Sequence, residues 1–229
     1  MLYMPFDSLY LYLVLPALIF SIWAQSRVTG SFKKYSAQRT VNGITGAEAA
    51  REVLRRAGVS DVQIQRVSGN LTDNFDPRTN VIRLSEKVYD AASVAAVGVA
   101  AHEAGHAVQY AIGYSPMKVR SAIIPVTNIG SKLSIPLVLL GIIFSMPGLI
   151  DIGIILFGAV VVFQLVTLPV EFNASRRAIE VLSESGLLTG DELPSAKKVL
   201  SAAALTYVGA LAVSLAQLIR LIAISRNRR

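Results

Sequence analysis

The sequence contains no cysteine and only two histidines among its 229 residues. The absence of cysteine excludes disulfide bonds and cysteine-ligated metal sites. Charged residues make up only 16% of the chain, 53% are hydrophobic, and the mean hydropathy is +0.52. A water-soluble domain of this size rarely combines so much apolar surface with so few charges. The composition therefore predicts a protein whose main partner is the lipid bilayer.

The net charge is +7, which by itself is compatible with a nucleic-acid partner. However, the sequence has neither a basic helix nor a basic patch interleaved with aromatic residues, so no nucleic-acid partner is predicted. Lysine and arginine instead sort between the two sides of a membrane. The charge is therefore interpreted by its position along the chain.

Four apolar segments predict membrane helices. Residues 6–24 form an uncleaved N-terminal anchor, because the basic residues follow the apolar run instead of preceding it. Residues 123–170 predict a transmembrane helical hairpin that turns at Pro147 and Gly148. A last apolar helix lies within residues 171–229.

Residues 27–122 differ in character and predict a small water-facing unit. Thr45 and Glu48 have the spacing of a capping box and begin a helix that ends at Gly58. An alternating strand follows at residues 62–67, and Ile82 and Leu84 are expected to face the core. The fold class predicted for the chain is α+β and mostly helical, with about four hydrophobic helices.

The distribution of basic residues predicts the topology. Residues 24–120 hold 13 lysines and arginines, residues 145–150 hold none, and residues 171–200 hold four. The positive-inside rule then places the small α+β unit in the cytoplasm and the hairpin turn outside. The four arginines from Arg220 onward conflict with this topology if the last helix crosses the membrane completely. The sequence alone leaves this conflict open.

Both histidines lie in the stretch HEAGH, as His102 and His106, with Glu103 between them. Residues four apart share one face of a helix, so the two imidazoles can bind one zinc ion. Glu103 is placed to act as the general base on a water whose pKa the zinc lowers. The motif therefore predicts zinc-dependent hydrolysis of peptide bonds, with one Zn²⁺ per chain.

A catalytic zinc takes three protein ligands and leaves one position open. With no further histidine and no cysteine, the third ligand must be a carboxylate. Asp151 lies in the hairpin turn, on the predicted opposite side of the membrane. Glu171 follows the hairpin, where the chain returns to the side of the histidines. A helix that begins near Pro169 would carry Glu171 in its first turn, with Ala174 and Ala178 as close-packing positions. Four other acidic residues have the character of ordinary solvated charges: Glu180, Glu184, Asp191 and Glu192.

HEAGH, followed after an apolar hairpin by VEFNASRRA, resembles the YugP-like neutral zinc metallopeptidases, an integral-membrane family of bacteria. That family is akin to the gluzincin-type HtpX and CAAX prenyl endopeptidases. The resemblance covers most of the chain and implies a zincin-like cytoplasmic unit with His102, His106 and Glu171 as metal ligands and Glu103 as the base. Ser175 stands where related groups often place an aspartate that orients a zinc histidine, and it can still hydrogen-bond an imidazole N–H.

The function predicted from these observations is a membrane-embedded zinc endopeptidase of the bacterial cell membrane, with its active site at the cytoplasmic surface. Its substrates would be peptides or membrane proteins, and the oligomeric state is not predicted. Residues 70–75 are the candidate edge strand for the substrate. Two alternatives stay open, a site-2-type intramembrane metalloprotease and a non-catalytic metal-binding scaffold.

Overall fold

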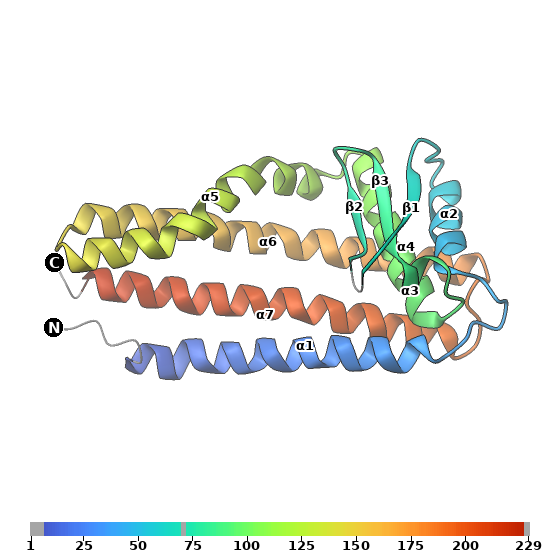
Figure 1. Ribbon diagram of the computed structural model, residues 1–229, viewed down its shortest axis with the longest axis horizontal. Coiled ribbons are helices and arrows are strands. Elements are labelled where there is room, and N and C mark those ends of the chain that lie inside the picture. The colour runs from blue at the N-terminus through green and yellow to red at the C-terminus, as the bar shows by residue number, and fades with distance from the viewer. Residues whose placement is uncertain (1–6, 70–71, 227–229) are drawn as a thin grey trace. The chain divides into compact units, whose positions relative to one another are not determined.

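The computed structural model describes residues 7–69 and 72–226, so residue 6 of the predicted anchor and residues 70–71 of the predicted edge strand lie outside it. Helices dominate this part of the chain (Figure 1). In chain order the elements are η1 (Tyr10–Val14), α1 (Leu15–Ser36), α2 (Gly46–Arg56), β1 (Gln63–Val67), β2 (Asn74–Asp76), β3 (Val81–Ser85), α3 (Glu86–Tyr89), α4 (Val94–Ala111), α5 (Ser115–Ile143), α6 (Pro147–Glu184) and α7 (Glu192–Arg226). The predicted fold class, mostly helical α+β with four long apolar helices, is confirmed.

The chain forms two compact units. The first takes in the described residues up to Ala24, residues 119–168 and those from Thr206 onward. The second consists of residues 25–118 and 169–205. Both predicted histidines and Glu171 belong to the second unit.

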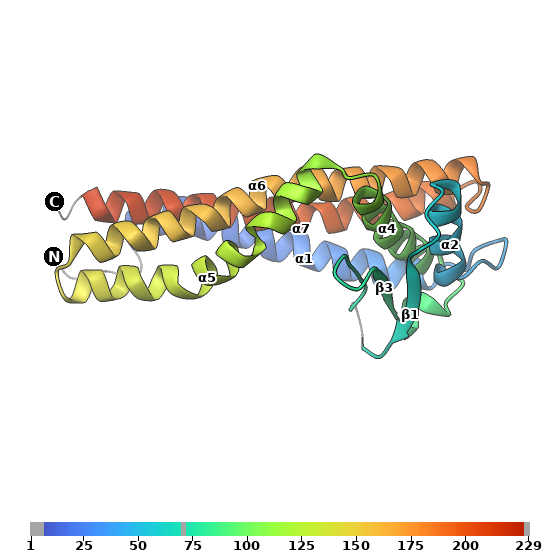
Figure 2. The same cartoon turned by 90° about the horizontal axis from the view of Figure 1, so that it is seen from above.

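Among the described residues, four helices are long and apolar enough to cross a membrane, and the first unit contains their apolar parts. Within it, α5 and α6 run side by side in both views (Figures 1 and 2). The contact is close because Gly153 on α6 has no side chain, and a Cβ there would lie 2.7 Å from the carbonyl oxygen of Ser134. Small residues at such contacts let membrane helices pack tightly.

Arg220, whose position conflicted with the predicted topology, is an internal charge of the first unit. Its residue is 3% exposed, and its Nε lies 3.0 Å from Oδ2 of Asp7. Its guanidinium also lies over the ring of Tyr10. A buried arginine with an acidic partner costs far less in an apolar unit than an isolated one. Arg220 therefore does not count as a free cytoplasmic charge, and α7 continues past it to Arg226.

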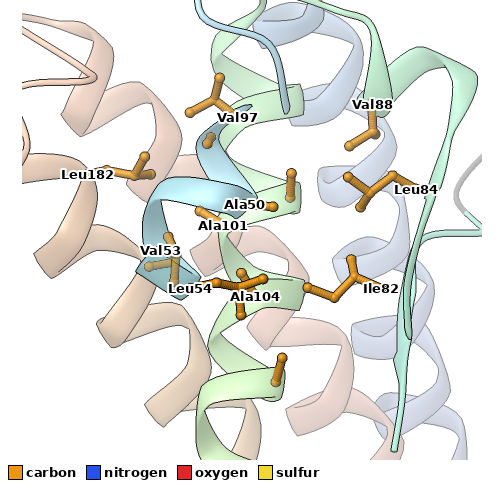
Figure 3. Close-up of a cluster of buried hydrophobic side chains, with 14 of the residues drawn as sticks. Ala50, Val53, Leu54, Ile82, Leu84, Val88, Val97, Ala101, Ala104 and Leu182 are labelled. Carbon is orange, nitrogen blue, oxygen red and sulfur yellow. The ribbon is translucent and has the colours of Figure 1, made fainter. Parts of the chain in front are cut away.

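The second unit is built around α4. Figure 3 shows Val53 and Leu54 of α2 and Ile82 of β3 gathered around the alanines of α4. Thr45 and Glu48 form the predicted capping box at the start of α2. Ile82 and Leu84 are fully buried, as the alternating pattern predicts. An alanine-rich α4 lets several elements approach one helix closely, and this places its histidines deep within the unit.

The strands form one sheet in the order β1-β3-β2, with β1 parallel and β2 antiparallel to β3. The edge strand β2 begins at Asn74, later than the predicted start at residue 70. Asp73 is instead turned to Ser85, whose backbone N–H and hydroxyl donate to its carboxylate at 2.7 and 3.0 Å. Burial raises the pKa of Asp73, and the bonds from Ser85 oppose that shift. This side-chain contact takes the place of a backbone hydrogen bond, so the pairing of β2 with β3 extends no further than Asn74.

One sequence expectation about α6 was wrong. A new helix was expected to begin near Pro169 and to carry Glu171 in its first turn. Instead α6 runs without a break from Pro147 to Glu184, with Pro169 inside it. Proline removes one backbone donor, but long apolar helices tolerate this loss where neighbouring groups satisfy the freed carbonyl. Glu171 is therefore held in a helix interior, far from the positive end of the helix dipole.

Candidate metal centre

Helix α4 presents both histidines on one face. Ser93 caps its first turn by accepting a hydrogen bond from the N–H of Ala96, and the helix continues to Ala111. The rings of His102 and His106 lie 4.6 Å apart between centroids and at 79° to each other. His106 is buried, and the side chain of His102 is 14% exposed. The predicted i, i+4 arrangement is therefore present.

Small residues bring Glu171 to this face. A Cβ on Gly105 of α4 would lie 2.7 Å from the carbonyl oxygen of Ala174 on α6, so only glycine permits this approach. Ala174 and Ala178, predicted as close-packing positions, are both fully buried. Because α4 and α6 come so close, the carboxylate of Glu171 lies next to both imidazoles.

The donor atoms fit a tetrahedral cation. Nε2 of His102 lies 3.2 Å and Nε2 of His106 lies 3.4 Å from Oε2 of Glu171. Two ligands at about 2.1 Å from a zinc ion, on tetrahedral bonds, lie about 3.4 Å apart. One ligand atom from each of the three side chains falls within 4.8 Å of the others, and this is the one such group of three in the described ranges 7–69 and 72–226. Two imidazoles and a carboxylate are also a donor set that zinc accepts.

Each imidazole has a partner on its other nitrogen. Nδ1 of His102 lies 3.0 Å from the hydroxyl of Ser175 on α6. Nδ1 of His106 lies 3.0 Å from Oε1 of Gln109, which is fully buried. If both Nδ1 atoms donate, both Nε2 lone pairs are left for a cation.

The carboxylate of Glu171 changes the proton affinity of the site. Burial alone would lower the pKa of His106, but the hydrogen bond and the charge of Glu171 outweigh it, so the pKa is raised. A proton and a metal ion would compete for the same lone pair on Nε2 of this imidazole.

Glu103 is not part of this group of donors. It projects from α4 toward the edge strand, and its Oε2 accepts a hydrogen bond of 2.9 Å from the backbone N–H of Phe75 in β2. Since this N–H is directed to α4, it is not used in the ladder with β3. The free edge of β2 therefore faces Glu103.

A groove borders the centre. It has a volume of about 440 Å³ and lies between residues 172–180 of α6 and 197–205 of α7. Its walls are mainly apolar, with Phe172, Leu200 and Leu205 among them, and Ser175 is a lining residue. Ser175 also contacts His102, so the groove and the histidine pair share one side chain.

The structure brings together His102, His106 and Glu171 and places Glu103 beside them. Asp151, the alternative carboxylate, is contacted instead by the hydroxyl of Ser225 at 3.3 Å in the first unit. The sequence reasoning missed Gln109, and it included Phe75 in the candidate edge strand without its hydrogen bond to Glu103. Gln109 had a signal, because it lies three residues after His106 and is polar in a helix of alanine and valine.

The chain is similar to known proteins over most of its length. The chain matches the family described as "Putative neutral zinc metallopeptidase" over residues 10–226. It is 47% identical over 221 residues to "Putative membrane protease YugP" of Bacillus subtilis (strain 168), covering 96% of this chain and 98% of that protein. No solved structure matches the chain. The chain therefore belongs to the neutral zinc metallopeptidase family.

Proposed function

We propose that the protein is a membrane-embedded zinc endopeptidase in which His102, His106 and Glu171 hold one zinc ion and Glu103 is the general base. The observation that carries this proposal is the tetrahedral spacing of three donors, with a further glutamate, Glu103, next to them but outside the donor group. A scaffold needs the donors but has no use for Glu103. The site-2-type alternative has less support, because among the described residues Asp151 is not in the donor group and is contacted by Ser225 instead.

The catalytic roles follow from chemistry at named atoms. A zinc ion bound by the three donors would lower the pKa of a water molecule and polarise the scissile carbonyl. Glu103 takes a proton from the attacking water and passes it to the nitrogen of the leaving amine. Ser175 and Gln109 hold the two imidazoles in orientation through their Nδ1 atoms.

The edge strand β2 supplies a place for the substrate backbone. An extended peptide pairs with an exposed sheet edge through main-chain hydrogen bonds. Such a peptide would compete with Glu103 for the N–H of Phe75, and the carboxylate would then be released toward the water. Binding of the substrate and activation of the base are thereby linked.

The groove between α6 and α7 supports an apolar substrate. A large apolar side chain gains about 25 cal/mol for each Å² removed from water, and the groove lies beside His102. Peptides and membrane proteins with exposed apolar segments are therefore the proposed substrate class. Mass spectrometry of the products would show large apolar residues near the cleaved bond, and cleavage without such a preference would contradict this assignment.

Removing the metal tests the reaction. We expect a chelator to abolish peptide cleavage by the purified protein and about one equivalent of zinc per chain to restore it, because all three ligands come from one chain. The measurement is peptide hydrolysis alongside metal analysis of the same samples. Cleavage that persists in protein shown to be metal-free would overturn the proposal.

We further propose that the metal centre faces the cytoplasm. The second unit carries most of the basic residues, and the hairpin turn at residues 145–150 carries none. The pairing of Arg220 with Asp7 accounts for one of the four arginines that conflict with this orientation.

Single cysteines can test the orientation, since the chain has none of its own. Ser60 is exposed in the second unit, and Met146 is 51% exposed in the hairpin turn. In intact cells we expect a membrane-impermeant maleimide to label Met146→Cys but to label Ser60→Cys only after the membrane is opened. The reverse pattern would place the active site outside.

A further inference from the structure

A short relay of polar groups leads from α6 to the ring of His106. Oε1 of Gln109 lies 3.0 Å from Nδ1 of His106. The other end of the same amide, Nε2, lies 2.8 Å from the carbonyl oxygen of Val170 and 3.0 Å from Oδ1 of Asn173. Gln109 is fully buried, so every polar atom of its side chain depends on protein partners.

The outermost groups of this relay have only one possible role each. The carbonyl of Val170 can only accept, and the Nε of Arg177, 2.8 Å from Oδ1 of Asn173, can only donate. The Gln109 atom that faces Val170 must therefore be its NH₂ group. For the same reason Asn173 must turn its oxygen inward, where it accepts from Gln109 and Arg177 together.

Both constraints orient the Gln109 amide in the same way, with its oxygen toward His106. An amide oxygen cannot donate, so Nδ1 of His106 has to carry the hydrogen. In a neutral imidazole the other nitrogen then has a lone pair, and here that nitrogen faces Glu171 at 3.4 Å. The relay thus determines which nitrogen of His106 can bind a metal.

We propose that the Val170 carbonyl, with Asn173 and Arg177, fixes His106 in the tautomer that presents Nε2 to the metal, acting through the amide of Gln109. These are positioning residues, since none of them touches the reacting atoms. Val170 directly precedes Glu171, so one turn of α6 supplies the third donor and also orients the second one. This inference builds on the metal site of the proposed function.

Variants at two positions separate positioning from packing. Gln109→Glu still presents an acceptor oxygen to Nδ1 of His106, so zinc affinity should stay within about 3-fold of wild type. Gln109→Leu has no acceptor there and should weaken zinc binding about 10–100-fold. Asn173→Asp keeps the inward acceptor next to Arg177, so zinc affinity should stay within about 3-fold of wild type, whereas Asn173→Leu should lose about 10-fold or more. Zinc affinity is measured by competition with a chelator.

Gln65→Leu makes the same chemical change at an exposed position of β1 and should leave zinc affinity unchanged. The melting temperature of each zinc-free variant shows whether the unit still folds. Wild-type affinity in Gln109→Leu would overturn the proposal, as would an equal loss in Asn173→Asp and Asn173→Leu.

A spectroscopic readout is independent of peptide cleavage. The chain has only two histidines, so ¹⁵N-histidine labelling reports only two rings. In the zinc-loaded protein we expect the protonated ring nitrogen of His106 to be Nδ1. Its proton should exchange slowly with water, since buried Gln109 covers it, and rapidly in Gln109→Leu. Protonation at Nε2 would refute the relay and leave the peptidase proposal intact. Bound zinc without any peptide cleavage would refute the peptidase proposal and leave the relay intact.

Discussion

Replacing Glu103 by glutamine should lower kcat for peptide hydrolysis about 1,000-fold while bound zinc stays at the wild-type level. Loss of a general base typically costs between 10² and 10⁴ in rate. The glutamine has no carboxylate to accept a proton from the attacking water. Glu103 is also not one of the three side chains that form the group of metal donors, so its replacement leaves those donors in place.

The choice of glutamine isolates the chemistry from the structure. Its side-chain oxygen can still accept the hydrogen bond from the N–H of Phe75, which alanine could not. Glu86→Gln, at the start of α3 in the same unit, is the matched control and should retain full activity. If Glu103→Gln kept its activity within 10-fold, another group would be the base. If it kept its cellular effect without cleavage in either protein, the chain would be a scaffold.

Replacing Glu171 by alanine or glutamine should remove the metal from the purified protein. Removing a residue that hydrogen-bonds to a metal ligand typically lowers metal affinity 10–100-fold. Loss of a direct ligand should cost more than about 100-fold, because two imidazoles alone do not form a closed set of donors. Glu171→Gln has nearly the same shape as glutamate, so a loss of zinc in that variant cannot be attributed to a cavity at this buried position.

Thermal unfolding gives a second measurement of the same change. Zinc binds the folded wild type and should stabilise it by about 2.7 kcal/mol at 100 times its Kd. We expect this rise in Tm to be absent from Glu171→Gln. Glu184→Gln, exposed at the end of α6 and outside the groove, should behave like wild type. Unchanged zinc and activity in Glu171→Gln would point to Asp151 or another carboxylate as the third ligand.

Local sequence patterns predicted the parts of the fold that depend on neighbouring residues. The capping box at Thr45 and Glu48 satisfies helix N–H groups within one turn, so its spacing alone is informative. Ile82 and Leu84 alternate with Arg83 because successive side chains of a strand point to opposite faces. His102 and His106 share a face for the equivalent reason in a helix.

Pattern reasoning failed where a distant contact overrides a local preference. Pro169 indicated a helix start, yet α6 passes through it. The four arginines from Arg220 onward left open whether the last helix crosses completely, and the ion pair of Arg220 with Asp7 joins two residues from opposite ends of the chain. A short stretch of sequence predicts neither the continuous helix at Pro169 nor the ion pair of Arg220.

Residue types and local spacing by themselves determined three things about this protein. They gave two histidines with Glu103 between them, the need for a carboxylate as a third donor, and four apolar helices. Only the tertiary structure places Glu171 3.2–3.4 Å from both imidazoles and turns Gln109 toward Val170. The physical reason is that these contacts join α4 to α6 across the close approach at Gly105 and Ala174. Helix periodicity is a local property of the chain, whereas the meeting of two helices depends on how the whole unit packs.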